Sequence, residues 1–218
     1  MSDSRLCTST YFDSATGALT VPINGGGANG GTNNQLLKLD ISSCLNSITT
    51  VTFAAGSQVT TIGASVFTSA SSLTSITIPA SVTSIGDNAF YTCSALTSVS
   101  FDAGSQLATI GQYVFASSGL TSITIPASVM SIGDNAFDSC TALTSVSFEA
   151  GSQLTSIGQS AFQGSNKLTS ITIPASVTSI GSIAFYQCNA LTSVSFEAGS
   201  QLTSIGSYSF RSTGLTSI

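Results

Sequence analysis

Few residues of this chain could act as catalytic acids or bases, and histidine is absent from its 218 residues. A serine or threonine nucleophile needs a neighbouring base, and only carboxylates are available for that role. Asp134 and Asp138 lie one helical turn apart and could form a carboxylate pair, but another copy of the same motif has Ser182 and Tyr186 at these positions. We therefore interpret the two acids as solvated surface residues and predict that the protein is not an enzyme.

Three further acids, Asp102, Glu149 and Glu197, occupy the same position in every second copy of an internal repeat. If the copies stack as parallel strands, neighbouring carboxylates lie about 9–10 Å apart. A bound cation needs oxygen ligands at about 2.3–2.6 Å, so these acids cannot share one ion. We expect neither a metal nor another cofactor, and assign the acids to solubility and to opposing aggregation.

Four of the five cysteines, Cys44, Cys93, Cys140 and Cys188, also occupy equivalent positions in alternate copies. A disulfide requires Cα atoms within about 7 Å, which is shorter than the expected distance between alternate copies. The same distance excludes a shared zinc ion. We expect these thiols to be free and to fill small spaces in the core, with Cys7 as an unpaired fifth.

The repeat that positions these residues is visible from Ile48 onwards. The apolar residues that open successive copies recur with a period of about 23–25 residues, which indicates a solenoid of short units stacked on one another. These residues are Ile48, Leu73, Leu96, Leu120, Leu143, Leu168, Leu191 and Leu215.

Each copy predicts a coil with one longer strand, a second short strand and a turn. In LTSITIP, Ile76 and Ile78 alternate with polar residues as in a half-buried strand, and Pro79 ends the strand. Val82 and Ile85 then re-enter the core, and Gly86 permits a turn. Ala89 and Phe90 follow on a helical or 3₁₀ turn, and the phenylalanine recurs in every coil to form one stacked column, at Phe67, Phe90, Phe115, Phe137, Phe162, Phe185 and Phe210.

Two kinds of coil alternate. A proline coil contains the I-P-A-S-V segment, and a glycine coil replaces it with the longer F-[DE]-A-G-S-Q-L, which turns at Gly-Ser. We refer to a proline coil and the glycine coil that follows it as a doublet. Parallel strands of successive coils are expected to form one continuous sheet.

Serine and threonine together make up a third of the chain and leave three hydroxyl columns on the outer face of that sheet. One interpretation is that duplication copied residues suited to an exposed strand; the other is a flat, uncharged recognition surface for a repetitive ligand. Varied aromatic and arginine side chains, which dominate specific protein interfaces, are missing there. The candidate ligand-binding residues are Thr74, Ser75, Thr77, Thr97, Ser98, Ser100, Thr121, Ser122, Thr124, Thr144, Ser145, Ser147, Thr169, Ser170, Thr172, Thr192, Ser193 and Ser195.

The repeat over residues 48–218 resembles the BspA-like leucine-rich repeats, which share the pattern I-P-x-[SG]-V-T-x-I-G-x-x-A-F and alternate coil types. The resemblance implies a leucine-rich-repeat solenoid dominated by β-structure, without the asparagine ladder of classical repeats. It also implies a microbial adhesion protein at the cell surface or outside the cell. The N-terminal residues MSDSRLCTSTYFDS contain no apolar core of a signal peptide, so the sequence itself leaves the location open.

Both ends depart from the pattern. We divide the chain into residues 1–47, an N-terminal cap (1–18) with a degenerate first coil (19–47), and residues 48–218, seven coils and a truncated eighth. The glycine-rich segment 24–31 lacks the G-K-[ST] of a phosphate loop and is interpreted as a surface loop. The eighth coil stops after LTSI, which indicates either a piece of a longer protein or end-to-end association.

Charge excludes further classes of function. The four basic residues, Arg5, Lys38, Lys167 and Arg211, are scattered singly in a chain of net charge −5, so no nucleic acid is expected as a partner. No apolar run approaches the roughly 18–20 residues that span a bilayer, which argues against membrane insertion.

The sequence therefore favours a non-enzymatic scaffold for binding or adhesion, with a protein, a glycan or another copy of the chain as its partner. A self-assembling filament or surface-layer unit is the first alternative, and its size would depend on concentration. Ice or crystal-surface binding is a weaker alternative, which thermal hysteresis would test.

Overall fold

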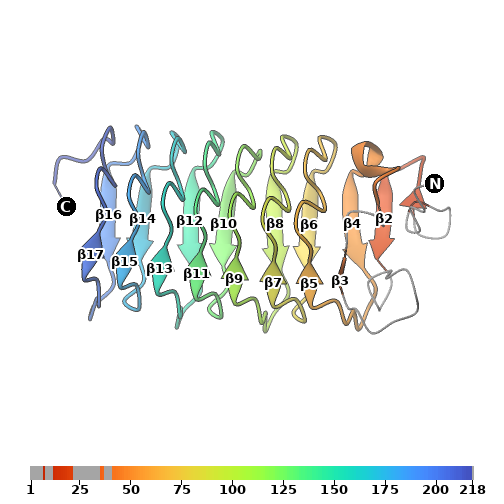
Figure 1. The fold of residues 1–218 in the computed structure, drawn as a ribbon, viewed down its shortest axis with the longest axis horizontal. Coiled ribbons are helices and arrows are strands. Elements are labelled where there is room, and N and C mark those ends of the chain that lie inside the picture. The colour runs from red at the N-terminus through yellow and green to blue at the C-terminus, as the bar shows by residue number, and fades with distance from the viewer. Residues whose placement is uncertain (1–6, 8–11, 22–34, 37–40, 218) are drawn as a thin grey trace.

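The computed structural model describes residues 7, 12–21, 35–36 and 41–217, and shows a straight rod of stacked coils in which β2 and β17 lie toward opposite ends (Figure 1). Longer strands form one side of the rod: β2 (Ala18–Val21), β4 (Thr50–Phe53), β6 (Ser75–Ile78), β8 (Ser98–Phe101), β10 (Ser122–Ile125), β12 (Ser145–Phe148), β14 (Ser170–Ile173) and β16 (Ser193–Phe196). Successive coils add parallel strands, which confirms the predicted leucine-rich-repeat solenoid.

The longer strands place apolar residues inside and hydroxyls outside. In β6, Ile76 and Ile78 are buried while Thr77 is exposed, and the pair Ile76–Val99 continues the core into β8. In the glycine coils the last strand residue is phenylalanine, as at Phe101, which is half-buried and packs against the edge of the core. The period-two burial pattern is therefore confirmed.

A second sheet of two-residue strands forms another side of the rod. Its eight strands are hydrogen-bonded in one unbroken parallel series, and each of the inner ones contributes a buried isoleucine such as Ile85 or Ile110. The strands are β3 (Gln35–Leu36), β5 (Thr61–Ile62), β7 (Ser84–Ile85), β9 (Thr109–Ile110), β11 (Ser131–Ile132), β13 (Ser156–Ile157), β15 (Ser179–Ile180) and β17 (Ser204–Ile205).

The remaining side is a column of turns that carries the phenylalanines, and its backbone differs from the helical or 3₁₀ turn expected from the sequence. Asn88 and Thr92 have positive φ angles of 59° and 57°, so the chain cannot continue as a helix. The N–H groups of Asn88, Phe90 and Thr92 donate to carbonyls of the next coil. Stacking between coils therefore replaces the hydrogen bonds that a helix would make within one turn. A 3₁₀ helix, η3, spans Leu45–Ser47.

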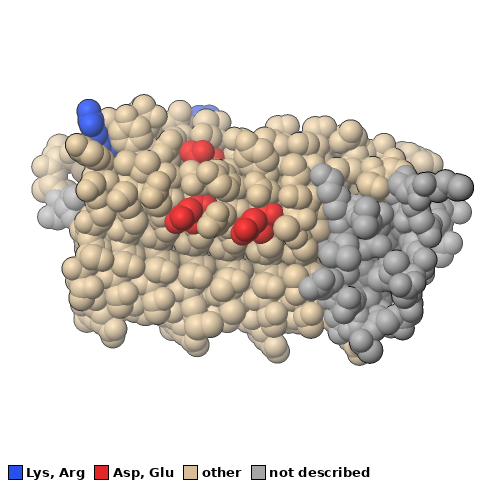
Figure 2. Space-filling view, in the orientation of Figure 1, with Lys and Arg blue, Asp and Glu red and all other residues tan. Residues whose placement is uncertain are grey.

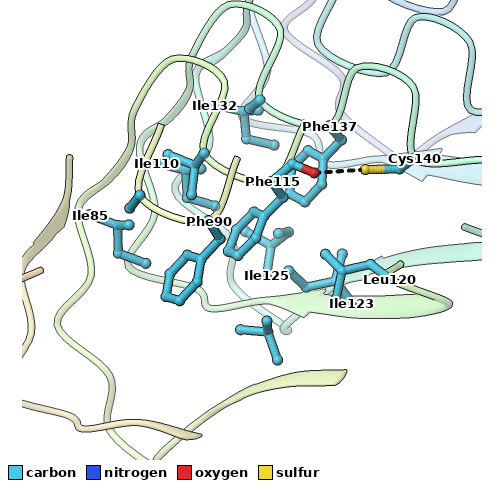
Figure 3. Packing of buried hydrophobic residues seen from close by; sticks show 14 of the residues in the cluster. Ile85, Phe90, Ile110, Phe115, Leu120, Ile123, Ile125, Ile132, Phe137 and Cys140 are labelled. Atoms are coloured by element: carbon cyan, nitrogen blue, oxygen red, sulfur yellow. Dashed lines mark hydrogen bonds between the residues drawn. The ribbon is translucent and has the colours of Figure 1, made fainter. Parts of the chain in front are cut away.

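The phenylalanine column is present as predicted. Neighbouring rings lie 5.0 to 5.4 Å apart between centroids, with 1° to 21° between their planes. Figure 3 shows Phe90, Phe115 and Phe137 stacked beside the isoleucines of both sheets. All rings from Phe67 to Phe185 are fully buried, and Phe210 is partly buried.

Gly86 and its counterparts have a different role from the turn that the sequence suggested. A Cβ atom on Gly158 would lie 2.6 Å from the carbonyl carbon of Gly133 in the preceding coil, and one on Gly181 would lie 2.5 Å from the backbone of Gly158. These glycines are required because the backbones of successive coils approach one another too closely for any side chain. A second set does make turns: Gly104, in the Gly-Ser turn of a glycine coil, has a φ of 75°.

The outer sheet is not continuous, and its breaks follow the alternation of coils. Within each doublet four residue pairs align, from Ser75–Ser98 to Ile78–Phe101 in β6 and β8. Between doublets the pairing falls to two pairs at β4–β6, to the single pair Ser98–Ser122 at β8–β10, and to none at β12–β14. The expected continuous sheet is therefore divided between doublets.

Proline accounts for the missing last bond at each junction between doublets. Within a doublet the N–H of Asp102 donates to the carbonyl of Ile78, and Glu149 donates in the same way to Ile125. At the next junction the equivalent residue is Pro126, which has no N–H to donate to the carbonyl of Phe101. Each proline thus ends its own strand and also removes the last hydrogen bond to the preceding coil.

At the N-terminal end, β1 (Phe12–Asp13) pairs antiparallel with β2, and β2 continues the outer sheet in parallel with β4. The glycine-rich segment 24–31 and most of residues 1–11 lie outside the described residues. At the other end, residues 215–217 form no strand. By analogy with Leu191 and Ser193, a strand of the eighth coil would begin only at Ser217.

Candidate functional site

The three predicted hydroxyl columns lie side by side on the outer face of the longer strands. Their members are exposed in all six coils, except that Ser75 is half-buried. They face outward because each lies between inward-pointing apolar residues, as Ser122 and Thr124 flank Ile123. The sequence therefore located this surface correctly, while its use for binding stays a prediction.

Hydroxyls of the first and third columns are engaged within the protein. In the first column threonine hydroxyls reach back one coil: Thr144 donates to the carbonyl of Thr121 at 3.0 Å, and Thr121 donates to that of Thr97 at 3.3 Å. In the third column, hydroxyls pair across a doublet at 2.9 Å, as Thr124 does with Ser147. These bonds hold the side chains in fixed orientations before any ligand arrives. Thr169 lies at the broken β12–β14 junction, and its hydroxyl does not donate to the preceding coil as the other threonines of the first column do.

The middle column is different, because the structure shows no hydrogen bond for its hydroxyls. Among the described residues, these serine side chains face solvent without a partner inside the protein: Ser98, Ser122, Ser145, Ser170 and Ser193. A hydroxyl can donate one hydrogen bond and accept two, so this column retains its full capacity for a ligand. The candidate surface thus consists of two largely fixed rows with an available row between them.

The repeated acids have a role that the sequence did not reveal. Glu149 reaches back one coil, and its Oε2 accepts a hydrogen bond of 3.0 Å from the N–H of Ala127, the residue after Pro126. Glu197 makes the same bond to the N–H of Ala175. These carboxylates therefore connect coils, while their role in solubility stays a prediction. In the sequence, only the position of these acids opposite the proline segment indicated this role. The period of the repeat alone does not identify which backbone group a side chain contacts.

Asp134 and Asp138 interact with different neighbours. Asp134 accepts a 2.7 Å hydrogen bond from the N–H of Gln159 in the next coil, and Asp87 does the same for Gln112. Burial raises the pKa of Asp138, partly offset by a hydrogen bond from Ser139. Within the described ranges, no three His, Cys, Asp or Glu side chains lie close enough together to hold a metal ion.

The cysteine prediction is right for three residues and wrong for two. Cys93, Cys140 and Cys188 are buried free thiols, but Cys44 forms a disulfide with Cys7, with 5.6 Å between their Cα atoms. The expected distance between coils holds only for equivalent positions in the repeat. Cys7 lies outside the repeat, 37 residues before its partner, so the coil spacing did not apply to it.

The three free thiols donate to the backbone of the preceding coil. Cys140 Sγ lies 3.1 Å from the carbonyl oxygen of Phe115, and Figure 3 shows this bond at the edge of the phenylalanine column. Burial raises the pKa of Cys140 to about 11, and the pKa of both Cys93 and Cys188 to about 12. Protonated, inaccessible thiols are structural rather than reactive.

Charged residues make up only 6% of the chain. The face shown in Figure 2 has only isolated acidic and basic side chains on a background of uncharged residues. Every buried side-chain nitrogen or oxygen among the described residues has a hydrogen-bond partner. No helix in this part of the chain has the length and apolar character to cross a membrane.

This fold and its repeated surface define the protein as a leucine-rich-repeat solenoid. The model of the BspA type leucine rich repeat region matches residues 41–148 and 108–218, in six copies. The chain belongs to this family, as the sequence resemblance indicated. Family and fold are typical of non-enzymatic scaffolds.

Solved structures agree with this assignment. The pneumococcal vaccine antigen PcpA shares 35% identity with a TM-score of 0.57, over 59% of this chain and 31% of that chain. A leucine-rich repeat protein from Bacteroides ovatus shares 27% identity with a TM-score of 0.54, over 73% of this chain and 46% of that chain. The chain thus covers less than half the length of either protein. A comparison with curated proteins gave no match.

Proposed function

We propose that this protein is an adhesion scaffold that binds a protein, glycan or other repetitive surface through the hydroxyl columns of its outer sheet. The observation that carries the proposal is the middle serine column, whose hydroxyls are exposed and without partners inside the described part of the protein. An array of identical groups on a rigid rod suits a ligand that itself repeats, because each coil then contributes the same weak contact.

Display outside the cytosol is part of the proposal and has separate support. Disulfides persist in oxidising compartments and are rare in the cytosol, and Cys7–Cys44 joins the N-terminal segment to the first coils. The similarity to PcpA, described as a vaccine antigen, points in the same direction. Hydroxyl-based contacts carry no charge, so we expect binding to vary little with salt concentration.

The test compares two triple variants on a glycan array and on immobilised extracellular-matrix proteins, at low and high salt. Thr121→Lys, Thr144→Lys and Thr169→Lys together place like charges on adjacent strands and are expected to abolish binding. Asp87→Asn, Asp102→Asn and Asp134→Asn keep an acceptor oxygen at each position, lie outside the hydroxyl columns and are expected to bind as the wild type does. If the acid variant lost binding while the lysine variant kept it, the hydroxyl surface would not be the binding site.

A further inference from the structure

The breaks in the outer sheet open two matching grooves, at the β8–β10 and β12–β14 junctions, with volumes of about 220 and 200 Å³. Every lining residue of the first has a counterpart of the same or a similar type in the second, one doublet further along: Val99 matches Val146, and Phe101 matches Phe148. At β4–β6, where two strand pairs remain, a pocket instead lies beyond the strand ends, around Ala55 and Pro79. The two grooves therefore lie at the two junctions between doublets with the fewest strand pairs.

Each groove is lined mostly by polar groups. Val99 and Ile123 lie at the floor of the first groove, but their side chains are buried in the core, and half-buried Phe101 borders the groove. Ser98 and Ser122, both from the column without internal partners, lie on its two sides. The groove thus offers hydroxyls that are free to donate or accept, beside the partly exposed ring of Phe101.

One carboxylate completes each groove. Glu149 lines the first, and its hydrogen bond to the Ala127 N–H uses Oε2 and holds the side chain in place. No hydrogen bond within the described residues uses the other oxygen, Oε1. Glu197 repeats this arrangement through Ala175 at the second groove. The Phe101 carbonyl, which Pro126 cannot engage, adds another acceptor to the border of the groove.

We propose that the two grooves are successive subsites for a neutral, extended polysaccharide that runs along the rod with one disaccharide for each doublet of coils. A sugar ring carries hydroxyl groups that can form hydrogen bonds with the serines and with the carboxylate oxygen. The grooves are two coils apart, about 9–10 Å, which is close to the length of a disaccharide in an extended β-1,4-linked chain. This inference rests on the proposed binding function and assigns its ligand class.

The carboxylates in the grooves argue against charged repeating polymers as the ligand. A fixed carboxylate at each groove repels uronic-acid and sulfated chains, and one negative charge per doublet is sparse for a cationic polymer. An array of two matching grooves also predicts dependence on chain length. A disaccharide occupies one groove, whereas a longer chain reaches both and gains from the high effective concentration of the second contact.

The experiment titrates the full chain with cello-oligosaccharides and chito-oligosaccharides of two to six sugars, followed by calorimetry. The dissociation constant is expected to fall at least roughly tenfold once a chain spans both grooves. Ser100→Tyr fills the first groove and Ser147→Tyr the second. Each single variant is expected to lose the gain in affinity that longer oligosaccharides show. The double variant is expected not to bind. Melting curves verify that the exposed substitutions leave the fold intact.

Thr52→Tyr is the matched control, because Thr52 occupies the same position in the first glycine coil but lines neither groove. It is expected to bind all oligosaccharides as the wild type does. Hyaluronan should not bind, and polylysine should not compete. The inference is overturned if none of the neutral oligosaccharides binds, if Ser100→Tyr and Ser147→Tyr leave their binding unchanged, or if polylysine binds the grooves in a salt-sensitive manner.

The same groove variants on the glycan and matrix arrays separate this inference from the proposed function. If wild-type binding persists in the Ser100→Tyr/Ser147→Tyr variant but is lost in the threonine-to-lysine variant, the adhesion surface stands and the groove assignment fails. If the wild type binds no array component and no oligosaccharide, both fail.

Discussion

The ring of Phe137 lies parallel to the ring of Phe162, with 5.0 Å between the centroids and 1° between the planes. On its other side Phe137 stacks on Phe115 at 5.3 Å, so it has a neighbour in both adjacent coils. Phe210 has only Phe185 as a partner in the described column and is partly exposed. The contribution of a ring to stability should therefore depend on its place along the rod.

We expect Phe137→Ala to lower the free energy of unfolding by about 3–5 kcal/mol, because it leaves a cavity in a closely packed interior. Phe210→Ala should cost less, since its ring buries less surface. Urea unfolding of both variants gives the comparison. Equal losses would contradict the description of the rod as coils stabilised by their nearest neighbours.

A second prediction concerns Ile183, whose φ of 51° is strained for a β-branched residue. The equivalent residues Asn88 and Asn135 have φ of 59° and 57°, and asparagine tolerates this conformation better. Ile183→Asn is expected to stabilise the protein by about 1 kcal/mol. The reverse change, Asn135→Ile, should destabilise it by a similar amount. If Ile183→Asn lowered the thermal stability and Asn135→Ile raised it, side-chain packing would outweigh backbone strain here.

The third prediction counts thiols. In denaturant without reductant, three thiols per chain should react with a thiol reagent, and all five after reduction, because Cys7 and Cys44 are joined. A crosslink closing a 37-residue loop is expected to contribute about 3–4 kcal/mol to the coils that it joins. Cys7→Ser should show four thiols and a less stable N-terminal end. Five reactive thiols in the unreduced protein would disprove the disulfide.

The fourth prediction is a loss of stability at alkaline pH. In the folded protein burial raises the pKa of Cys93, Cys140 and Cys188 to about 12, 11 and 12, from an ordinary value of 9.0. Below pH 9 the thiols are protonated in both states, so their contribution is fully present. Above pH 9 only the unfolded state ionises, and stability falls up to about pH 11–12.

Raising the pH from 8 to 10 should lower the free energy of unfolding by about 1 kcal/mol for each buried thiol. Urea midpoints at the two values measure this change. The control replaces all three residues, Cys93→Ala, Cys140→Ala and Cys188→Ala, and should retain only the pH dependence of the other groups. If the alanine variant lost as much stability as the wild type, the thiols would not be responsible.

The fold followed from the sequence because one pattern is repeated along the chain and each copy predicts the same burial. Ile76, Ile78 and Phe90 could be placed in the core from spacing alone, and their counterparts supported the same placement. The candidate surface followed too, since Thr77 and Ser100 alternate with buried residues. Periodicity predicts the direction of a side chain well.

Features that depend on a particular partner could not be predicted in this way. The bond from the Ala127 N–H to Glu149 depends on a side chain reaching across a coil, and the Cys7–Cys44 disulfide involves a residue outside the repeat. The opening at β8–β10 had a signal in Pro126, but we interpreted proline only as the end of its own strand. Its missing N–H also affects the coil before it.

This proline arrangement restricts how such a rod can change length during evolution. Removing the single proline coil that contains Pro126 would place two glycine coils in contact, so that the half-buried Phe101 and Phe148 would become direct neighbours across one junction. Removing a whole doublet instead leaves every remaining junction between the same two kinds of coil as before. Gene duplication or deletion should therefore be tolerated in steps of two coils, and related rods whose lengths differ by one coil should be rare.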